Sequence, residues 1–263
     1  MDNVKIVFTD LDNTLTSTPE KVDIKNKDVF EKLSNIGIPV VLNTGRSLPY
    51  AIPICKQYML SNYVITSNGA EIYNMASDTM LYRNIISKEN LEKLDKLVIK
   101  HNLYFTCNGI KKRYSNKIEN GMKLSYVNAI TEVKDEISQV VVQSVNIEDM
   151  IAFKKDLMDI KLKIVNKSKY VVEGKMLYYD IVNPDVSKGN ALKILCNHLN
   201  IDISRSMAIG DSSNDLEMLE SAGYKVAVAN ATDDLKAIAD TITLSNTDNG
   251  VYVVLSELYS KLR

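Results

Sequence analysis

The sequence predicts an α/β protein, in which helices cover both faces of a parallel sheet and a second, α+β domain is inserted into the chain. Short runs rich in β-branched residues alternate with helical patterns before Gly69. The pattern changes after Gly69 and returns from Ser187 onward. Strand–helix–strand alternation is typical of a parallel sheet that is buried on both sides.

The first part of the chain predicts three strands separated by two helices. We expect strands at 4–8, 38–42 and 63–66, because each is short and mostly apolar. A helix around 29–35 follows from the spacing of its apolar residues, and a second helix is expected at 47–59. Pro49 is tolerated in the first turn of that helix, whereas Pro53 leaves its start open.

The middle of the chain predicts the inserted domain, and the last part predicts a return to the first pattern. We assign 81–184 to an α+β cap domain and both 1–80 and 185–263 to a Rossmann-like core. The expected cap elements are helices at 90–101 and 147–160 and strands at 103–106, 139–145 and 162–165. The expected core elements after the cap are helices at 189–199 and 215–222 and strands at 207–209, 225–229 and 241–244.

Composition excludes several classes of function. The net charge is −1, so no basic surface for nucleic acid is indicated. No apolar segment reaches the roughly 18 residues of a membrane span, and no signal peptide is visible. Three separated cysteines without CxxC spacing predict reduced thiols in a cytoplasmic protein. The two histidines are isolated, which argues against a histidine metal site or a Ser-His-Asp triad.

Asp10 and Asp12 are candidate functional residues at the end of the first predicted strand. In an extended strand, residues i and i+2 point the same way and lie about 7 Å apart, which leaves room for one tetrahedral group between the two carboxylates. Ligands of open α/β sheets bind beyond the carboxyl ends of the strands. Asn13 suits the tight turn that follows. The alternative is a polar turn in which an aspartate caps the next helix.

Polar groups also follow three other predicted core segments. Thr44, Gly45 and Arg46 come after the second strand, where a hydroxyl and an open backbone at a helix start can bind an anion. Lys188 falls at another helix start, where its charge opposes the helix dipole, so a bound anion would explain it. The segment Gly210-Asp211-Ser212-Ser213-Asn214-Asp215 joins a strand to a helix; an acidic first turn explains Asp215 but leaves Asp211 unexplained.

This ordered set of motifs resembles the haloacid dehalogenase-like superfamily of phosphohydrolases. The motifs Asn68-Gly69-Ala70, Ser187-Lys188-Gly189 and Asn249-Gly250-Val251, together with a large cap inserted after the third core strand, resemble its Cof-type sugar-phosphatase branch. The resemblance covers essentially the whole chain, although its specific motifs lie in the core. Asn13 stands where many members have Gly, and Asn43 stands where Ala or Ser is frequent.

The resemblance implies a role for each motif residue. Asp10 is the expected nucleophile and Asp12 the expected general acid and base. Mg²⁺ is the expected cofactor, bound by the Asp10 carboxylate, the Asp12 backbone carbonyl and Asp211. Asp215 is expected to contact these ligands without binding the metal itself. Hard oxygen ligands suit Mg²⁺, so no His or Cys is needed. The residues expected to bind substrate phosphate are Thr44, Gly45, Arg46, Lys188 and Asn214.

The resemblance therefore implies that the protein is a phosphoric monoester hydrolase. The expected substrates are small phosphorylated metabolites, with sugar phosphates as the first candidates, and the expected intermediate is an aspartyl-phosphate. Alternatives are a phosphomutase on the same fold and a non-enzymatic, phospho-accepting signalling module. Candidate cap contacts to substrate are Lys111, Arg113, Tyr114 and Lys123. We expect no nucleic-acid or membrane partner and a monomer or weak homodimer. The sequence names neither the substrate nor the cap residues that select it.

Overall fold

The computed structural model describes residues 1, 3–18, 21–118, 124–167 and 175–263. The described chain divides into two compact units. The larger unit comprises Met1–Arg46, Tyr50–Tyr82 and Ser187–Arg263, and the smaller unit comprises Ser47–Pro49 and Arg83–Val186. The smaller unit is therefore inserted between two halves of the larger one in sequence.

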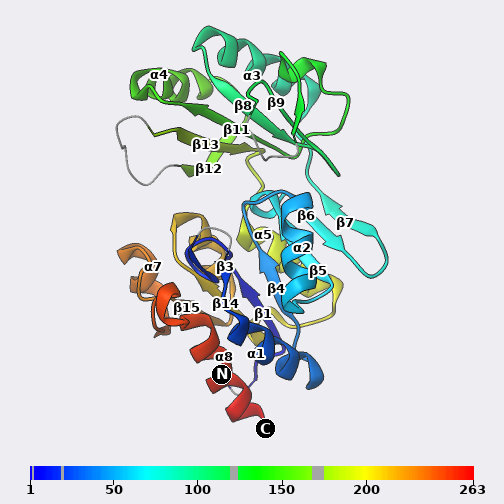
Figure 1. Cartoon of the computed structure of the whole chain (residues 1–263), viewed down its shortest axis with the longest axis vertical. Coiled ribbons are helices and arrows are strands. Elements are labelled where there is room, and N and C mark those ends of the chain that lie inside the picture. The colour runs from blue at the N-terminus through cyan, green and yellow to red at the C-terminus, as the bar shows by residue number, and fades with distance from the viewer. Residues whose placement is uncertain (2, 19–20, 119–123, 168–174) are drawn as a thin grey trace. The chain divides into compact units, whose positions relative to one another are not determined.

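The larger unit is built on one twisted sheet of eight described strands (Figure 1). Six neighbouring strands, from β16 to β5, pair in parallel, and β6 then pairs antiparallel with β5. The central strands are buried at every residue, as expected where both faces are covered. The strand order is β16 (Thr241–Ile242), β15 (Tyr224–Ala227), β14 (Ser206–Gly210), β1 (Ile6–Thr9), β4 (Val40–Asn43), β5 (Tyr63–Thr66), β6 (Glu71–Asn74) and β7 (Thr79–Arg83).

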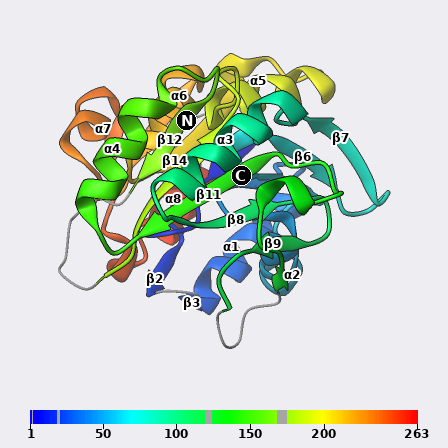
Figure 2. The same cartoon turned by 90° about the horizontal axis from the view of Figure 1, so that it is seen from above.

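Helices lie on both faces of this sheet. Figures 1 and 2 show α1 (Ile24–Asn35), α2 (Leu48–Tyr58) and α8 (Gly250–Leu262) on one face. The other face carries α5 (Lys188–His198) and α6 (Leu216–Ser221), with α7 (Asp233–Ile238) beside β15. Two short strands, β2 (Thr16–Thr18) and β3 (Lys21–Val22), follow β1 and pair antiparallel with each other. The α/β class expected from the sequence is confirmed.

The smaller unit is a six-stranded, mostly antiparallel sheet covered on one face by α3 (Lys88–Lys100) and α4 (Ile147–Leu157) (Figure 1). Leu94 and Val98 of α3 and Phe153 of α4 pack on apolar side chains of the central strands, so the unit has its own core. Its strand order is β10 (Leu124–Tyr126), β9 (Arg113–Ser115), β8 (Tyr104–Asn108), β11 (Gln139–Ser144), β13 (Leu177–Val182) and β12 (Lys163–Lys167).

Some elements were not expected from the sequence. The C-terminal helix α8 buries Val251, Val254, Leu255 and Leu258 at helical spacing, and it begins after Asn249 in the left-handed conformation. Strands β9 and β10 were also missed, because strands of three residues give a weak alternation signal, and the six-residue strand β13 was missed as well. A turn at residues 75–78 joins β6 to β7, which are neighbours in the sheet. No helix formed by the described residues is long and apolar enough to cross a membrane.

The close packing of α5 on α6 gives a test of the fold. A Cβ added at Gly189 would lie 2.3 Å from the carbonyl oxygen of Glu217. We therefore expect Gly189→Ala to lower the free energy of unfolding by about 1–3 kcal/mol, because the two helices must separate. Urea unfolding followed by circular dichroism measures the effect. Asn197→Ala on the exposed side of α5 is the control and should change stability by no more than about 0.5 kcal/mol.

Candidate active site

Asp10 lies directly after β1, in the middle of the sheet of the larger unit. Its backbone N–H donates to the carbonyl of Ile209 at 3.0 Å, so the loop stays attached to β14 beyond the end of the strand. The side chain is almost fully buried. Asn13 then turns the chain with φ of 61°, a left-handed conformation that Asn adopts more readily than most residues. The expected turn at Asn13 is confirmed.

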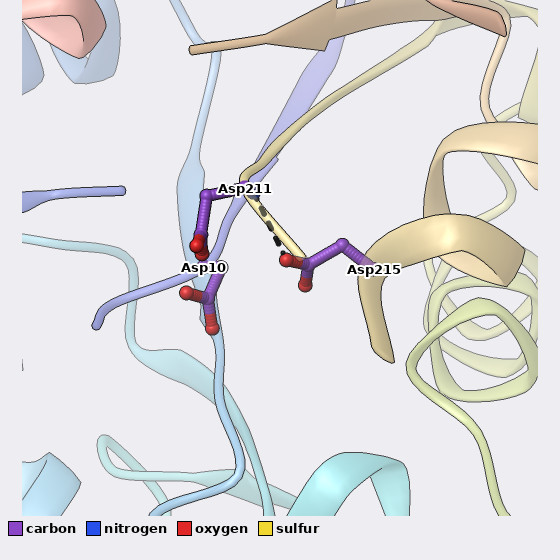
Figure 3. A group of neighbouring side chains, drawn as sticks. All are labelled: Asp10, Asp211 and Asp215. Atoms are coloured by element: carbon purple, nitrogen blue, oxygen red, sulfur yellow. Dashed lines mark hydrogen bonds between the residues drawn. The ribbon is translucent and has the colours of Figure 1, made fainter. Parts of the chain in front are cut away.

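Asp211 and Asp215 come from the end of the neighbouring strand β14. The backbone N–H groups of Asp211 and Ser212 both donate to Asp215 Oδ2, each at 3.1 Å. Thr14 Oγ1 donates to Asp211 Oδ1 at 3.1 Å, which joins the loop after β1 to this segment. Oxygens of Asp10, Asp211 and Asp215 all lie within 4.8 Å of one another, and all three residues are buried. Figure 3 shows the carboxylates of Asp10 and Asp211 next to each other and the Asp215 side chain extending toward them from the other side.

Lys188 places a buried positive charge against this group. It is the first residue of α5, which Ser187 caps by accepting a hydrogen bond from Asn190 N–H. Its Nζ lies 2.5 Å from Asp10 Oδ1 and 2.6 Å from Asp215 Oδ1. The ammonium at the helix start is thus explained by two carboxylates of the protein itself. Asn43 Nδ2 donates to the Lys188 carbonyl at 3.0 Å and holds the start of the helix against β4.

Burial and neighbouring charges both shift the pKa values of Lys188 and Asp10. Burial acts to lower the pKa of Lys188, but the charges of Asp10 and Asp215 outweigh it, so the pKa is raised and the ammonium stays charged. Burial raises the pKa of Asp10 well above its usual value of 3.8. Lys188 opposes that rise, whereas Asp215, Asp211 and Asp12 add to it. When all three carboxylates are ionised, they outnumber the single ammonium and leave an excess of negative charge in a region with little access to water.

The donor set fits a hard divalent cation. The three carboxylates supply only oxygen, and Mg²⁺ is usually held in proteins by one or two carboxylates together with water and substrate oxygens. A divalent cation at this position would also balance the excess negative charge. The Asp12 side chain does not belong to the group of three, whereas Asp215 does.

Asp12 is paired with Arg46 instead. Nε and Nη2 of Arg46 donate to the two carboxylate oxygens of Asp12 at 2.9 and 2.8 Å, and the guanidinium stacks 4.4 Å from the centre of the Tyr50 ring. Both side chains of the pair are 38% exposed. β1 ends at Thr9, so Asp10 and Asp12 lie in the loop that follows the strand, Asp10 buried and Asp12 half exposed. The common orientation of the two carboxylates, expected from extended-strand geometry, stays a prediction.

The other predicted phosphate-binding residues surround one residue that received no role from the sequence, Asn68. Asn214 Nδ2 donates to Asn68 Oδ1 at 3.0 Å, and a Cβ at Gly45 would lie 3.0 Å from the Asn68 amide. The backbone N–H of Asn68 donates to the carbonyl of Thr44 at 3.0 Å. The sequence signal for Asn68 was its place in the segment Asn68-Gly69-Ala70 after a strand.

The candidate cap contacts lie in the smaller unit. Arg113 begins β9, and its Nε donates to Asn108 Oδ1 at 3.3 Å. Tyr114 follows on the same strand, and Lys111 lies in the preceding loop. Lys123 lies outside the described residues.

A family model for haloacid dehalogenase-like hydrolases matches residues 7–255. The chain belongs to this family, and it is a hydrolase of the phosphatase kind. It is 26% identical over 250 residues to the 5-amino-6-(5-phospho-D-ribitylamino)uracil phosphatase of Bacillus subtilis, an alignment that covers 95% of this chain and 93% of the relative.

Solved structures show the same fold. A haloacid dehalogenase-like hydrolase from B. subtilis superposes with a TM-score of 0.85 at 25% identity, over 97% of this chain and 100% of that one. A sugar phosphatase of haloacid dehalogenase subclass IIB superposes with a TM-score of 0.82 at 20% identity, over 97% and 99% of the two chains. The resemblance to the superfamily and to the fold of its Cof-type branch is confirmed.

The raised pKa of Asp10 predicts how stability depends on pH when metal is removed. Folded protein binds the Asp10 proton more tightly than the unfolded chain, so this group makes the free energy of unfolding fall as pH rises above 3.8. Asn cannot lose a proton. We therefore expect Asp10→Asn to be more stable than wild type in EDTA, with a difference that grows as the pH rises above the usual pKa of 3.8.

Urea unfolding at several pH values in EDTA measures this difference. Saturating Mg²⁺ should stabilise wild type more than the variant, because the variant has lost one anionic ligand. Stability curves that stay parallel across the pH range in EDTA would contradict the expected charge state of Asp10.

Proposed function

We propose that the protein is a Mg²⁺-dependent phosphatase that hydrolyses small phosphorylated metabolites, sugar phosphates in the first place, through an aspartyl-phosphate on Asp10. The observation that carries the proposal is the convergence of Asp10, Asp211, Asp215 and Lys188, from three separate segments, at the carboxyl ends of parallel strands. A site of this kind combines a nucleophilic carboxylate, oxygen ligands for a cation and a fixed positive charge.

In the proposed reaction, a carboxylate oxygen of Asp10 attacks phosphorus while the bond from phosphorus to the leaving oxygen breaks. Asp12 gives its proton to that oxygen, and the alcohol departs. Asp12 then takes a proton from a water molecule, which attacks phosphorus and breaks the acyl-phosphate bond. Inorganic phosphate leaves, and Asp10 and Asp12 return to their starting states.

Lys188 orients the nucleophile in this scheme. Its ammonium fixes Asp10 Oδ1 and counters the repulsion between a carboxylate and an anionic phosphate. Asp10 and Asp211, with the Asp12 backbone carbonyl and with support from Asp215, would hold Mg²⁺, which would supply further positive charge near the phosphoryl oxygens. Thr44, the Gly45 backbone and Asn214 bind the remaining phosphoryl oxygens.

The pair of Asp12 and Arg46 must separate during this cycle. A guanidinium has only hydrogen-bond donors, so Asp12 can only accept within the bidentate pair. Acting as an acid requires that Arg46 moves to another acceptor, and a substrate phosphate is such an acceptor. The predicted role of Arg46 in phosphate binding and its observed contact with Asp12 then describe two stages of one cycle.

Support for small phosphorylated substrates comes from the relatives. The B. subtilis relative is named for a phosphorylated ribitylaminouracil, and the subclass IIB neighbour is named a sugar phosphatase. The smaller unit, with its candidate contacts Lys111, Arg113 and Tyr114, is proposed to select among such substrates. The chain belongs to a family of hydrolases, which gives the non-enzymatic alternative no support.

The proposal is tested by release of inorganic phosphate from a panel of sugar phosphates, nucleotides and aryl phosphates, with Mg²⁺ and with EDTA. We expect release from sugar phosphates that EDTA abolishes. Asp10→Asn should reduce kcat by at least about 10³-fold, because an amide oxygen is a poor nucleophile. Circular dichroism should show that the variant is folded. Activity of that variant near the wild-type level would exclude Asp10 as the nucleophile.

The phosphomutase alternative predicts a different product. Incubation with a hexose phosphate would give an isomer of the substrate and little free phosphate. Free phosphate in an amount equal to the substrate consumed would exclude that alternative.

A further inference from the structure

The turn at residues 67–69 has an unusual backbone. Ser67, Asn68 and Gly69 have successive φ values of 52°, 57° and 97°. The left-handed region is unfavourable for residues with a Cβ, and two such residues in succession require support from their surroundings. The whole turn is buried.

Contacts with two neighbouring segments hold this turn in place. The backbone N–H of Ser67 donates to the Arg46 carbonyl at 2.9 Å, and that of Asn68 to the Thr44 carbonyl at 3.0 Å. A Cβ at Gly69 would lie 2.2 Å from the carbonyl oxygen of Ser187, so only glycine fits there. The turn therefore contacts the segment of Thr44–Arg46 and the residue before Lys188.

A buried carboxylate stabilises the entrance to the turn. Glu71 is fully buried, and its Oε2 accepts hydrogen bonds from Thr66 Oγ1 at 2.8 Å and from Ser67 Oγ at 3.5 Å. Both hydroxyls belong to residues at the start of the turn. This carboxylate has no part in the proposed reaction, and its position is explained by the backbone that it supports.

The side chain that the turn presents is Asn68, which contacts Asn214. Asn68 Oδ1 accepts from Asn214 Nδ2 at 3.0 Å, while Asn214 Oδ1 accepts from Ser212 Oγ at 2.7 Å. Both ends of the Asn214 amide are thereby hydrogen-bonded. A flip of the Asn214 amide would lose the bond to Asn68, because the two amide oxygens would then face each other, whereas Ser212 Oγ could still bond by accepting. One N–H of Asn214 Nδ2 remains beyond the bond to Asn68, because the group carries two hydrogens.

We propose that Asn68 is a positioning residue for phosphate recognition. Asn68 fixes the Asn214 amide so that the remaining N–H of Nδ2 donates to a phosphoryl oxygen. The left-handed turn, which Glu71 supports, places the Asn68 side chain against Asn214. Asn68 acts through Asn214 and does not take part in bond making. This inference rests on the proposed function, in which Asn214 binds the phosphoryl group.

The test is Asn68→Gly, which removes the amide and keeps a residue suited to the left-handed backbone. We expect kcat/KM for a sugar phosphate to fall about tenfold and inorganic phosphate to bind about tenfold more weakly in the presence of Mg²⁺, as expected for one misdirected hydrogen bond to a charged group. Isothermal titration with inorganic phosphate gives the second readout without turnover. The melting temperature should not fall.

Asn200→Gly is the matched control. Asn200 has a φ of 53°, belongs to the same unit and is exposed after α5, so this variant reproduces the backbone change away from the site. It should match wild type in kcat/KM and in phosphate binding. Equal behaviour of Asn68→Gly and Asn200→Gly would overturn the proposal, and so would a failure of Asn68→Gly to fold, which would assign Asn68 to stability.

A double-mutant cycle with Asn214→Ala separates positioning from independent binding. If Asn68 acts through Asn214, then Asn68→Gly has little further effect once Asn214 is alanine. If the losses of kcat/KM caused by Asn68→Gly and by Asn214→Ala were fully additive in free energy, the inference would be overturned. Absence of phosphate release and phosphate binding in wild type itself would instead defeat the proposed function, so the two failures are distinguishable.

Discussion

Excess negative charge in a buried place is the constraint on which the site depends. Asp10, Asp211 and Asp215 bring their oxygens within 4.8 Å, and Lys188 offers one positive charge against three. Isolated buried charges are expensive, and a buried pair is tolerated only when its remaining hydrogen-bonding groups are satisfied. Asp215 meets this condition through two backbone N–H groups, and Asp211 through Thr14. The negative charge left over suits the site to a divalent cation.

The parallel sheet makes this concentration of charge possible. Strands β1, β4 and β14 are neighbours in the sheet, and the loops that follow them leave from the same edge. Backbone N–H groups and the helix start of α5 are available at that edge for polar side chains. The same edge carries the turn of Asn68, which joins the segments before α2 and α5 to Asn214. A substitution in this turn would displace several of the residues that are proposed to bind phosphate.

The two aspartates of the first loop illustrate how environment separates roles. Asp10 is buried and held by Lys188, whereas Asp12 is half exposed and held by Arg46. A buried, positioned carboxylate suits attack on phosphorus, and a more exposed one suits exchange of protons with a leaving group and with water. Two identical side chains two residues apart therefore serve different steps of the proposed reaction.

The sequence by itself determined the α/β class, because the spacing of apolar residues indicates which faces of helices and strands are buried. It also indicated the residues that meet at the site, because ligands of parallel sheets bind at the carboxyl ends of the strands, where these polar residues occur. It did not determine side-chain partners. Only the tertiary structure showed that Lys188 pairs with Asp10 and Asp215, that Arg46 pairs with Asp12, and that Asn68 contacts Asn214. Such partners lie up to 178 residues apart, and no local pattern encodes contacts that exist only after separate strands have assembled into one sheet.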